Sequence, residues 1–302
     1  MLDCKQGKRA IVRSSRLSAG ALLIASLAVL SLAAPALATP KGEYAVFADC
    51  PVEAATACLH ASTESGEFIV GKKTVPITKT ITLQGGLNET ESGLVFVAAK
   101  DGNTLSKTPQ KVPGGILGVN CTLIKGSGWL EVGARELCEA IFENGYTGVN
   151  ATTELAAPAS AIQVDIGNLL AGEGVALTLP VKVHLENPLL GGKCYVGSNA
   201  NPIHLLLTTG KTTPPAPNKS ISGNPGSLEF NPEGTILTVS KNSLVDNALS
   251  APATNGCGEA FEFLVGPIIN SILGVPSLSG HNTAILNGTL EQTGAEDVIA
   301  HE

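Results

Sequence analysis

The sequence has few aromatic residues and few charges. Aromatic side chains make up 4% of the 302 residues, with a single tryptophan, and charged side chains make up 15%. A folded core must therefore rely on Val, Ile, Leu and Ala, and little material is left for an aromatic platform that stacks on sugars. Apolar residues reach 43% of the chain, which excludes wholesale disorder.

Common catalytic and nucleotide-binding motifs are missing as well. No C-x-x-C, G-x-S-x-G, H-E-x-x-H or G-x-G-x-x-G pattern occurs. The stretch GEFIVGKKT approaches a phosphate-binding loop through Gly66, Gly71 and Lys72, but Lys73 stands where a Mg²⁺-binding Ser or Thr is required. A Ser-His-Asp site needs no local motif, so a secreted hydrolase with a motif-free active site stays open. We expect no cofactor.

The N-terminus has the pattern of a secretory signal peptide. An apolar run, residues 17–32, and the stretch APALATP follow a basic start formed by Lys5, Lys8, Arg9, Arg13 and Arg16. This order predicts export and cleavage after Ala38, with residues 1–38 removed. The run is shorter than the roughly 20 residues of a spanning helix, and no second long run follows, so we expect no membrane span after cleavage.

Cleavage makes the remaining chain strongly acidic. Residues 1–38 hold five of the 19 basic residues and one of the 26 acidic residues, which leaves a net charge of −11. Such a chain repels nucleic acid, whose binding needs basic patches, and it disfavours anionic lipid. We therefore expect a secreted, extracellular protein with cell-envelope components as its partners, loosely associated with the wall.

Cysteine usage fits export. Cys4 leaves with the signal, and six cysteines remain: Cys50, Cys58, Cys121, Cys138, Cys194 and Cys257. An even number in an exported chain favours disulfides, and six cysteines allow 15 connectivities. Local pairing would join them in sequence order, with the second pair fixing a helix to the strand before it. His60, close to Cys58, leaves a metal site or a reactive thiol as alternatives.

Alternating apolar residues predict a mainly β fold. The clearest run, residues 175–186, places Val175, Leu177, Leu179, Val181, Val183 and Leu185 on one face, with an edge or bulge at Pro180. The run VPITKTITL alternates in the same way. Further expected strands are 44–48, 68–70, 94–98, 162–166, 203–208, 235–239, 260–265 and 283–290. Short strands between turn residues are typical of sandwich-like antiparallel sheets.

Two segments predict short helices, and one segment predicts a boundary. A helix is expected near 129–144, ending at Gly145, and another is expected to start at Pro267 and end at Gly274. The Pro-rich stretch 211–225 is either a linker or a loop. It divides a β-rich lobe, 39–210, from a second one, 226–302, which belong to one domain or to two.

Several polar residues are candidates for chemistry, and none is singled out by its spacing. His184 and His204 fall on outward strand positions, His281 lies in a turn and His301 lies in the tail. The pairs Glu259 with Glu262 and Asp165 with Glu173 could supply the two carboxylates of a glycosidase. No D-x-D-x-D loop supports calcium binding.

Two stretches carry a resemblance. They are LPVKVHLENPLLGGKCYVGSNANPIHLLLTTG and NSLVDNALSAPATNGCGEAFEFLVGPIINSILGVPSLSGHNTAILNGTL. They resemble uncharacterised secreted proteins of actinobacteria, and the likeness covers most of the chain after the signal. It implies export from a bacterium and carries no activity with it.

These observations predict a disulfide-stapled extracellular protein with a non-catalytic binding or structural role at the cell envelope. The secreted hydrolase is one alternative. A small-ligand carrier with a cavity inside the β structure is another.

Overall fold

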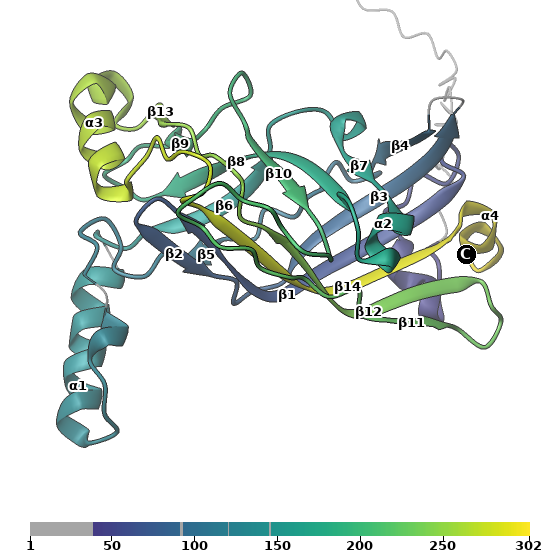
Figure 1. Ribbon diagram of the computed structural model, residues 1–302, viewed down its shortest axis with the longest axis horizontal. Coiled ribbons are helices and arrows are strands. Elements are labelled where there is room, and N and C mark those ends of the chain that lie inside the picture. The colour runs from purple at the N-terminus through teal and green to yellow at the C-terminus, as the bar shows by residue number, and fades with distance from the viewer. Residues whose placement is uncertain (1–38, 91–92, 120, 145) are drawn as a thin grey trace, which may run out of the picture. The chain divides into compact units, whose positions relative to one another are not determined.

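The computed structural model describes residues 39–90, 93–119, 121–144 and 146–302 (Figure 1). The predicted signal peptide and Gly145 lie outside the described residues. Within them the chain forms two antiparallel seven-stranded sheets with a few short helices and three disulfides. The predicted mainly β, sandwich-like and disulfide-stapled fold is confirmed.

The first sheet contains β1 (Ala57–Val70), β2 (Lys73–Pro76), β3 (Ile81–Thr90), β4 (Gly93–Ala98), β11 (Ser227–Phe230), β12 (Ile236–Asp246) and β14 (Thr283–Gly294). The second contains β5 (Gln110–Lys111), β6 (Asn150–Leu155), β7 (Gln163–Val164), β8 (Leu177–Glu186), β9 (Tyr195–Val196), β10 (Ile203–Leu207) and β13 (Thr254–Asn255). The α-helices are α1 (Trp129–Cys138), α2 (Ile166–Ala171), α3 (Glu262–Leu273) and α4 (Ala295–Ala300). Shorter helical turns are η1 (Gly42–Phe47), η2 (Cys121–Leu123), η3 (Glu139–Glu143), η4 (Ala159–Ala161) and η5 (Glu259–Phe261).

The segments before and after the Pro-rich stretch share one sheet. Strand β14 lies between β1 and β12, so late strands pair directly with an early one. The Pro-rich stretch is a loop held to this body, because Asn218 donates hydrogen bonds to the carbonyls of Asn247 and Asn282. The described residues from 39 onward accordingly form a single compact unit.

The main core lies between the sheets. It joins Leu59 and Leu87 of the first sheet to Leu179, Val181 and Leu205 of the second. A smaller core packs η1 and α4 around the Cys50–Cys58 disulfide. The alternating apolar residues of β8 therefore lie on one face of the strand, and that face is turned to the opposite sheet, as a two-residue period predicts.

Strand β8 is a central strand, which corrects the expected edge at Pro180. It pairs with β6 along one side and β10 along the other. Proline is accommodated because the ladder with β6 ends at Val181, next to it. Its carbonyl oxygen still accepts a hydrogen bond from the Ala156 amide at 3.0 Å.

Two expected strands, 44–48 and 260–265, are wrong, and a third, 162–166, is shortened. Residues 42–47 form η1, in which Tyr44 and Phe47, three apart, bury their side chains together. Residues 162–166 contain only the short β7, because Asp165 caps the start of α2 by accepting a hydrogen bond from the Asn168 amide. Residues 260–265 belong to η5 and α3.

The two expected helices exist with altered limits. In α3 the helix begins at Glu262, so Pro267 lies inside it instead of in its first turn, while Gly274 ends it in the left-handed conformation as predicted. Helix α1 continues as the π-helical turn η3, and no residue of α1 is buried. The apolar stripe of this segment therefore does not pack on the core.

The three disulfides join the cysteines in sequence order, as local pairing predicts: Cys50–Cys58, Cys121–Cys138 and Cys194–Cys257. One detail of the expectation is wrong. Cys121 lies in η2, so the second disulfide fixes α1 to a helical turn and not to a strand.

Candidate functional site

An apolar cavity lies between the two sheets. Its walls come from both sheets and from α3, and include Phe68 of β1, Val181 and Val183 of β8, Leu205 of β10 and Ile269 of α3. Its volume is about 80 Å³, measured as the space that the centre of a water molecule can occupy. One water needs roughly 10–15 Å³ on this measure, so the cavity has room for several groups of that size.

A second apolar cavity adjoins the first. Its volume is about 70 Å³ on the same measure, and Leu59, Leu83 and Leu177 are among its lining residues. Phe68, Thr153 and Leu205 line both cavities. These three shared side chains therefore form the partition between the two cavities.

The composition accounts for this space. Val and Leu side chains are short, and Phe68 is the only aromatic residue that lines either cavity. Along the inward face of β8 the residues Leu177, Leu179, Val181 and Leu185 are buried and Val183 is half-buried, and all five line one of the two cavities. A core poor in aromatic side chains leaves two sheets imperfectly filled at their normal spacing.

The first cavity opens near β2 and the end of α3. Many of its lining residues, such as Val181, Val196 and Leu205, are buried, but Val70, Val75, Ile116, Ile272 and Leu273 at this end are half-buried. The turn between β1 and β2 is fixed to α3 here, since the Lys72 amide donates to the Leu273 carbonyl at 2.7 Å. We call these five residues, together with Lys73, the rim.

Lys73 is the charged residue of the cavity lining. It is half-buried, and its Nζ lies 3.4 Å from the carbonyl oxygen of Gly115. Within the described ranges, no carboxylate forms an ion pair with it. Burial lowers the pKa of Lys73 below its ordinary value, because desolvation disfavours the charged ammonium.

A polar cluster covers part of the outer face of the second sheet. The His184 ring stacks on Tyr195, with centroids 4.6 Å apart, and Lys182 Nζ lies 4.6 Å from the centroid of the Tyr195 ring. Glu154 lies 3.7 Å from Lys182 Nζ and 4.0 Å from His184 Nδ1. Desolvation, followed by the charge of Glu154, raises the pKa of Tyr195.

This cluster corrects the expectation for His184. Its side chain is 18% exposed and is not a solvated surface histidine, because Tyr195 on the neighbouring strand covers it. Its charged members compensate one another, and none of them lines either cavity. We therefore interpret the cluster as structural.

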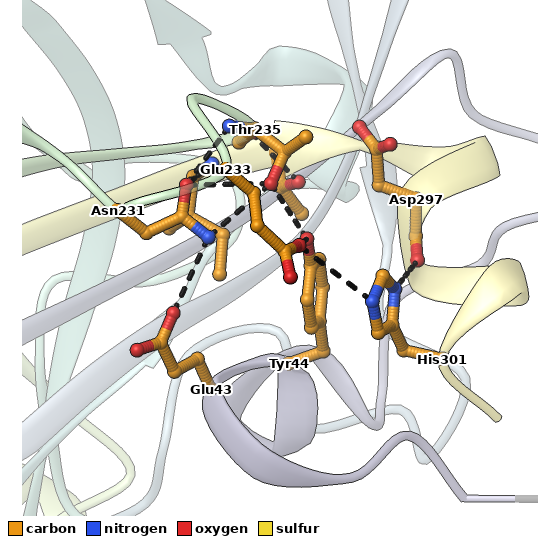
Figure 2. Close-up of polar contacts among 9 residues, drawn as sticks. Glu43, Tyr44, Asn231, Glu233, Thr235, Asp297 and His301 are labelled. Carbon is orange, nitrogen blue, oxygen red and sulfur yellow. Dashed lines mark hydrogen bonds and ion pairs between the residues drawn. The ribbon is translucent and has the colours of Figure 1, made fainter.

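A second polar cluster holds the two ends of the folded chain together (Figure 2). Tyr44 of η1 stacks on His301 at 3.9 Å between ring centroids, and its hydroxyl lies 2.6 Å from Thr235 Oγ1. Glu233 approaches His301 Nε2 at 3.8 Å, while His301 Nδ1 lies 2.7 Å from the Asp297 carbonyl. Both ring nitrogens of His301 thus have neighbours that fix the chain end, which favours a structural role.

The residues considered for a metal site, Cys50, Cys58 and His60, are engaged in other interactions. Cys50 and Cys58 are bonded to each other, and His60 Nδ1 lies 3.3 Å from Glu291 Oε2. No cluster of three or more His, Cys, Asp or Glu suited to a metal occurs in the part of the chain that the structure describes.

The candidate carboxylates hold backbone groups. Glu259 accepts a hydrogen bond from the Gly192 amide, and Glu262 accepts one from the Gly256 amide at 2.6 Å. Asp165 is the cap of α2, while Glu173 is exposed. No pair of them converges on a cavity.

The other histidine candidates and the phosphate-loop match have no supporting geometry. His204 and His281 are exposed and line neither cavity. Gly66 lies within β1 and Lys72 donates to the Ser271 carbonyl, so this stretch is a strand and a turn. Among the described residues, no helix is both apolar enough and long enough to cross a membrane.

Comparison with known proteins gives no relative: no family model matches the chain, and no curated protein or solved structure is detectably similar to it.

Sequence reasoning offered a cavity inside the β structure only as an alternative and could not place it, and it missed the position of Lys73. A cavity depends on how two sheets pack, and no local pattern encodes that. For Lys73 a signal was present: it lies two residues before Val75, and therefore on the inward phase of the same strand. A charged residue in phase with a core face is unusual enough to be noticed.

Proposed function

We propose that this protein binds a small apolar ligand between its sheets and acts as an extracellular carrier. The observation that carries the proposal is the pair of adjoining apolar cavities that share Phe68, Thr153 and Leu205. Apolar concave sites with a few polar groups at their edge are the usual form of small-molecule sites. The sequence alone favoured an envelope-binding role, and the cavities move the carrier to first place.

The lining offers little for catalysis. Gln110, a polar member, uses its Oε1 to accept from the amides of Thr78 and Lys79 and its Nε2 to donate to the Lys79 carbonyl. Its amide is therefore committed to the fold. The secreted hydrolase has no nucleophile and base brought together at this site, so binding is the function that the lining supports.

Filling the cavity should weaken ligand binding without unfolding the protein. Val183→Phe places a larger apolar side chain into existing space, so we expect the affinity for the apolar fluorescent probe 1-aminoanthracene to fall at least about tenfold. Fluorescence titration of the purified secreted protein measures this change, and thermal unfolding checks the fold.

Leu206→Phe is the matched control. Leu206 lies on β10 next to Leu205, but its side chain is 50% exposed on the opposite face. This variant should bind the probe as the parent does. Equal affinities of Val183→Phe and the parent would contradict the proposed site.

A second candidate function, association with a lipid surface of the envelope, is favoured by the exposed apolar side chains of α1. Trp129 is 82% exposed, Leu130 61% and Leu137 62%. Helix α1 follows the rim residue Ile116 in the chain, and the Ile116 amide donates to the Thr147 carbonyl at 2.8 Å. Exposed Trp and Leu on a helix are typical of interfacial binding.

Trp129 provides a direct test, because it is the only tryptophan of the chain. Neutral phosphatidylcholine vesicles should shift its fluorescence to shorter wavelength, and Trp129→Ala should reduce cosedimentation with them by about half or more. Leu189→Ala, at a side chain 62% exposed outside this helix, should cosediment like the parent. An unchanged spectrum with vesicles in excess would exclude this role for α1.

A further inference from the structure

We infer that the ligand is a single-chain amphiphile with an anionic headgroup, held with its chain in the cavity and its headgroup on Lys73. This inference rests on the proposed function and gives the chemical class of the ligand. It follows from three properties of Lys73: its charge, its lack of an anionic partner among the described residues, and its place on the rim.

Lys73 supplies the positive charge of an otherwise apolar lining. The remaining polar side chains of the first cavity are Gln110 and Thr153. Gln110 is fully engaged with backbone groups, as described above. A ligand group that needs a positively charged partner therefore finds that partner at Lys73.

The ammonium group lacks a compensating anion in the described part of the chain. Its Nζ donates to the neutral Gly115 carbonyl at 3.4 Å, and the carboxylate of Glu143, which accepts from the Gly114 amide, is already paired with Lys111 at 3.5 Å. A half-buried charge without a partner is costly, and an anion bound there recovers part of that cost. The lowered pKa of Lys73 has the same origin in desolvation.

The position of Lys73 on the rim places the two ends of such a ligand in different surroundings. Its neighbours Val75, Ile116 and Leu273 are half-buried at the opening, while the walls behind them, such as Val181 and Leu205, are buried and apolar. An alkyl chain directed inward occupies the first cavity up to the partition formed by Phe68, Thr153 and Leu205, and the headgroup stays at the solvent edge. This arrangement matches a fatty acid, with carboxylate at the rim and methylenes inside.

The test compares decanoate with decanol, which have the same chain and differ in headgroup charge. Displacement of 1-aminoanthracene from the delipidated protein at neutral pH gives both affinities. We expect the parent to prefer decanoate by about tenfold, the size of a charge-assisted hydrogen bond. Lys73→Met should lose this preference and still bind decanol, because methionine keeps an unbranched apolar stem without the terminal charge.

Two further variants keep the result interpretable. Lys73→Arg retains the charge and should retain the preference. Lys72→Met removes a neighbouring ammonium that is exposed and bonded to the Ser271 carbonyl, outside the lining, and should behave like the parent.

Each outcome separates the inference from the proposed function. A preference for decanoate that survives in Lys73→Met, or a parent that binds both ligands equally, contradicts the headgroup site and leaves the cavity as the binding site. Displacement by neither ligand contradicts both the headgroup site and the proposed function.

Discussion

Replacing Cys194 and Cys257 together with alanine should lower the free energy of unfolding by about 4 kcal/mol, the largest effect we expect from any single crosslink. The two residues are 63 apart in sequence, so their disulfide restricts the unfolded chain most. Both side chains are fully buried, and alanine avoids leaving an unpaired hydroxyl there. Urea denaturation with linear extrapolation measures the change.

The Cys50–Cys58 disulfide is the matched comparison. Its cysteines are eight apart, and the chain-entropy account assigns it about 2.5 kcal/mol. Removing it should therefore cost clearly less than removing Cys194–Cys257. An equal or reversed order would mean that strain or residual structure in the unfolded chain, and not loop length, determines these stabilities.

Asn282→Ala should destabilise the protein by about 3 kcal/mol, because it leaves several buried backbone groups without a partner. Asn282 is completely buried. Its Oδ1 accepts from the Gly71 amide at 2.9 Å, and its Nδ2 donates to the carbonyls of Leu249 and Leu278, each at 3.0 Å. One amide thus joins three loops, among them the turn that carries Lys73 to the rim.

Asn287→Ala is the control for this prediction. Asn287 follows on β14, is half-buried, and donates only a long hydrogen bond of 3.5 Å to Ser65. Its removal should change the stability by less than about 0.5 kcal/mol, as for most surface substitutions. Equal unfolding midpoints for the two variants would show that water replaces the Asn282 side chain without loss.

The Asn282 variant also bears on the cavity. If the Gly71 turn loosens, Lys73 is no longer held at the opening, and the decanoate preference should weaken at temperatures where the protein is still folded. Lys73→Met should lose the same preference without loss of stability. The two variants therefore separate positioning of the headgroup site from its charge.

The sequence predicted the elements whose signals are local. Alternation over residues 175–186 gave β8, and Gly274 gave the end of α3, because strand period and left-handed glycine caps act over a few residues. The disulfide pairing also followed chain order. Prediction failed at 260–265, where alternation agreed with a strand. There Val265, Ile269 and Ile272, spaced four and three apart, fit a helix that packs against the opening of the cavity.

The sequence by itself determined an acidic, aliphatic, disulfide-bonded β protein, because composition, cysteine number and two-residue periodicity do not depend on the path of the chain. Only the tertiary structure decided that β14 enters between β1 and β12, that short aliphatic side chains leave space between the sheets, and that Lys73 lies at its opening. Sheet order and packing gaps arise from contacts between residues far apart in sequence, such as Ala61 with Leu290, and no local pattern records them.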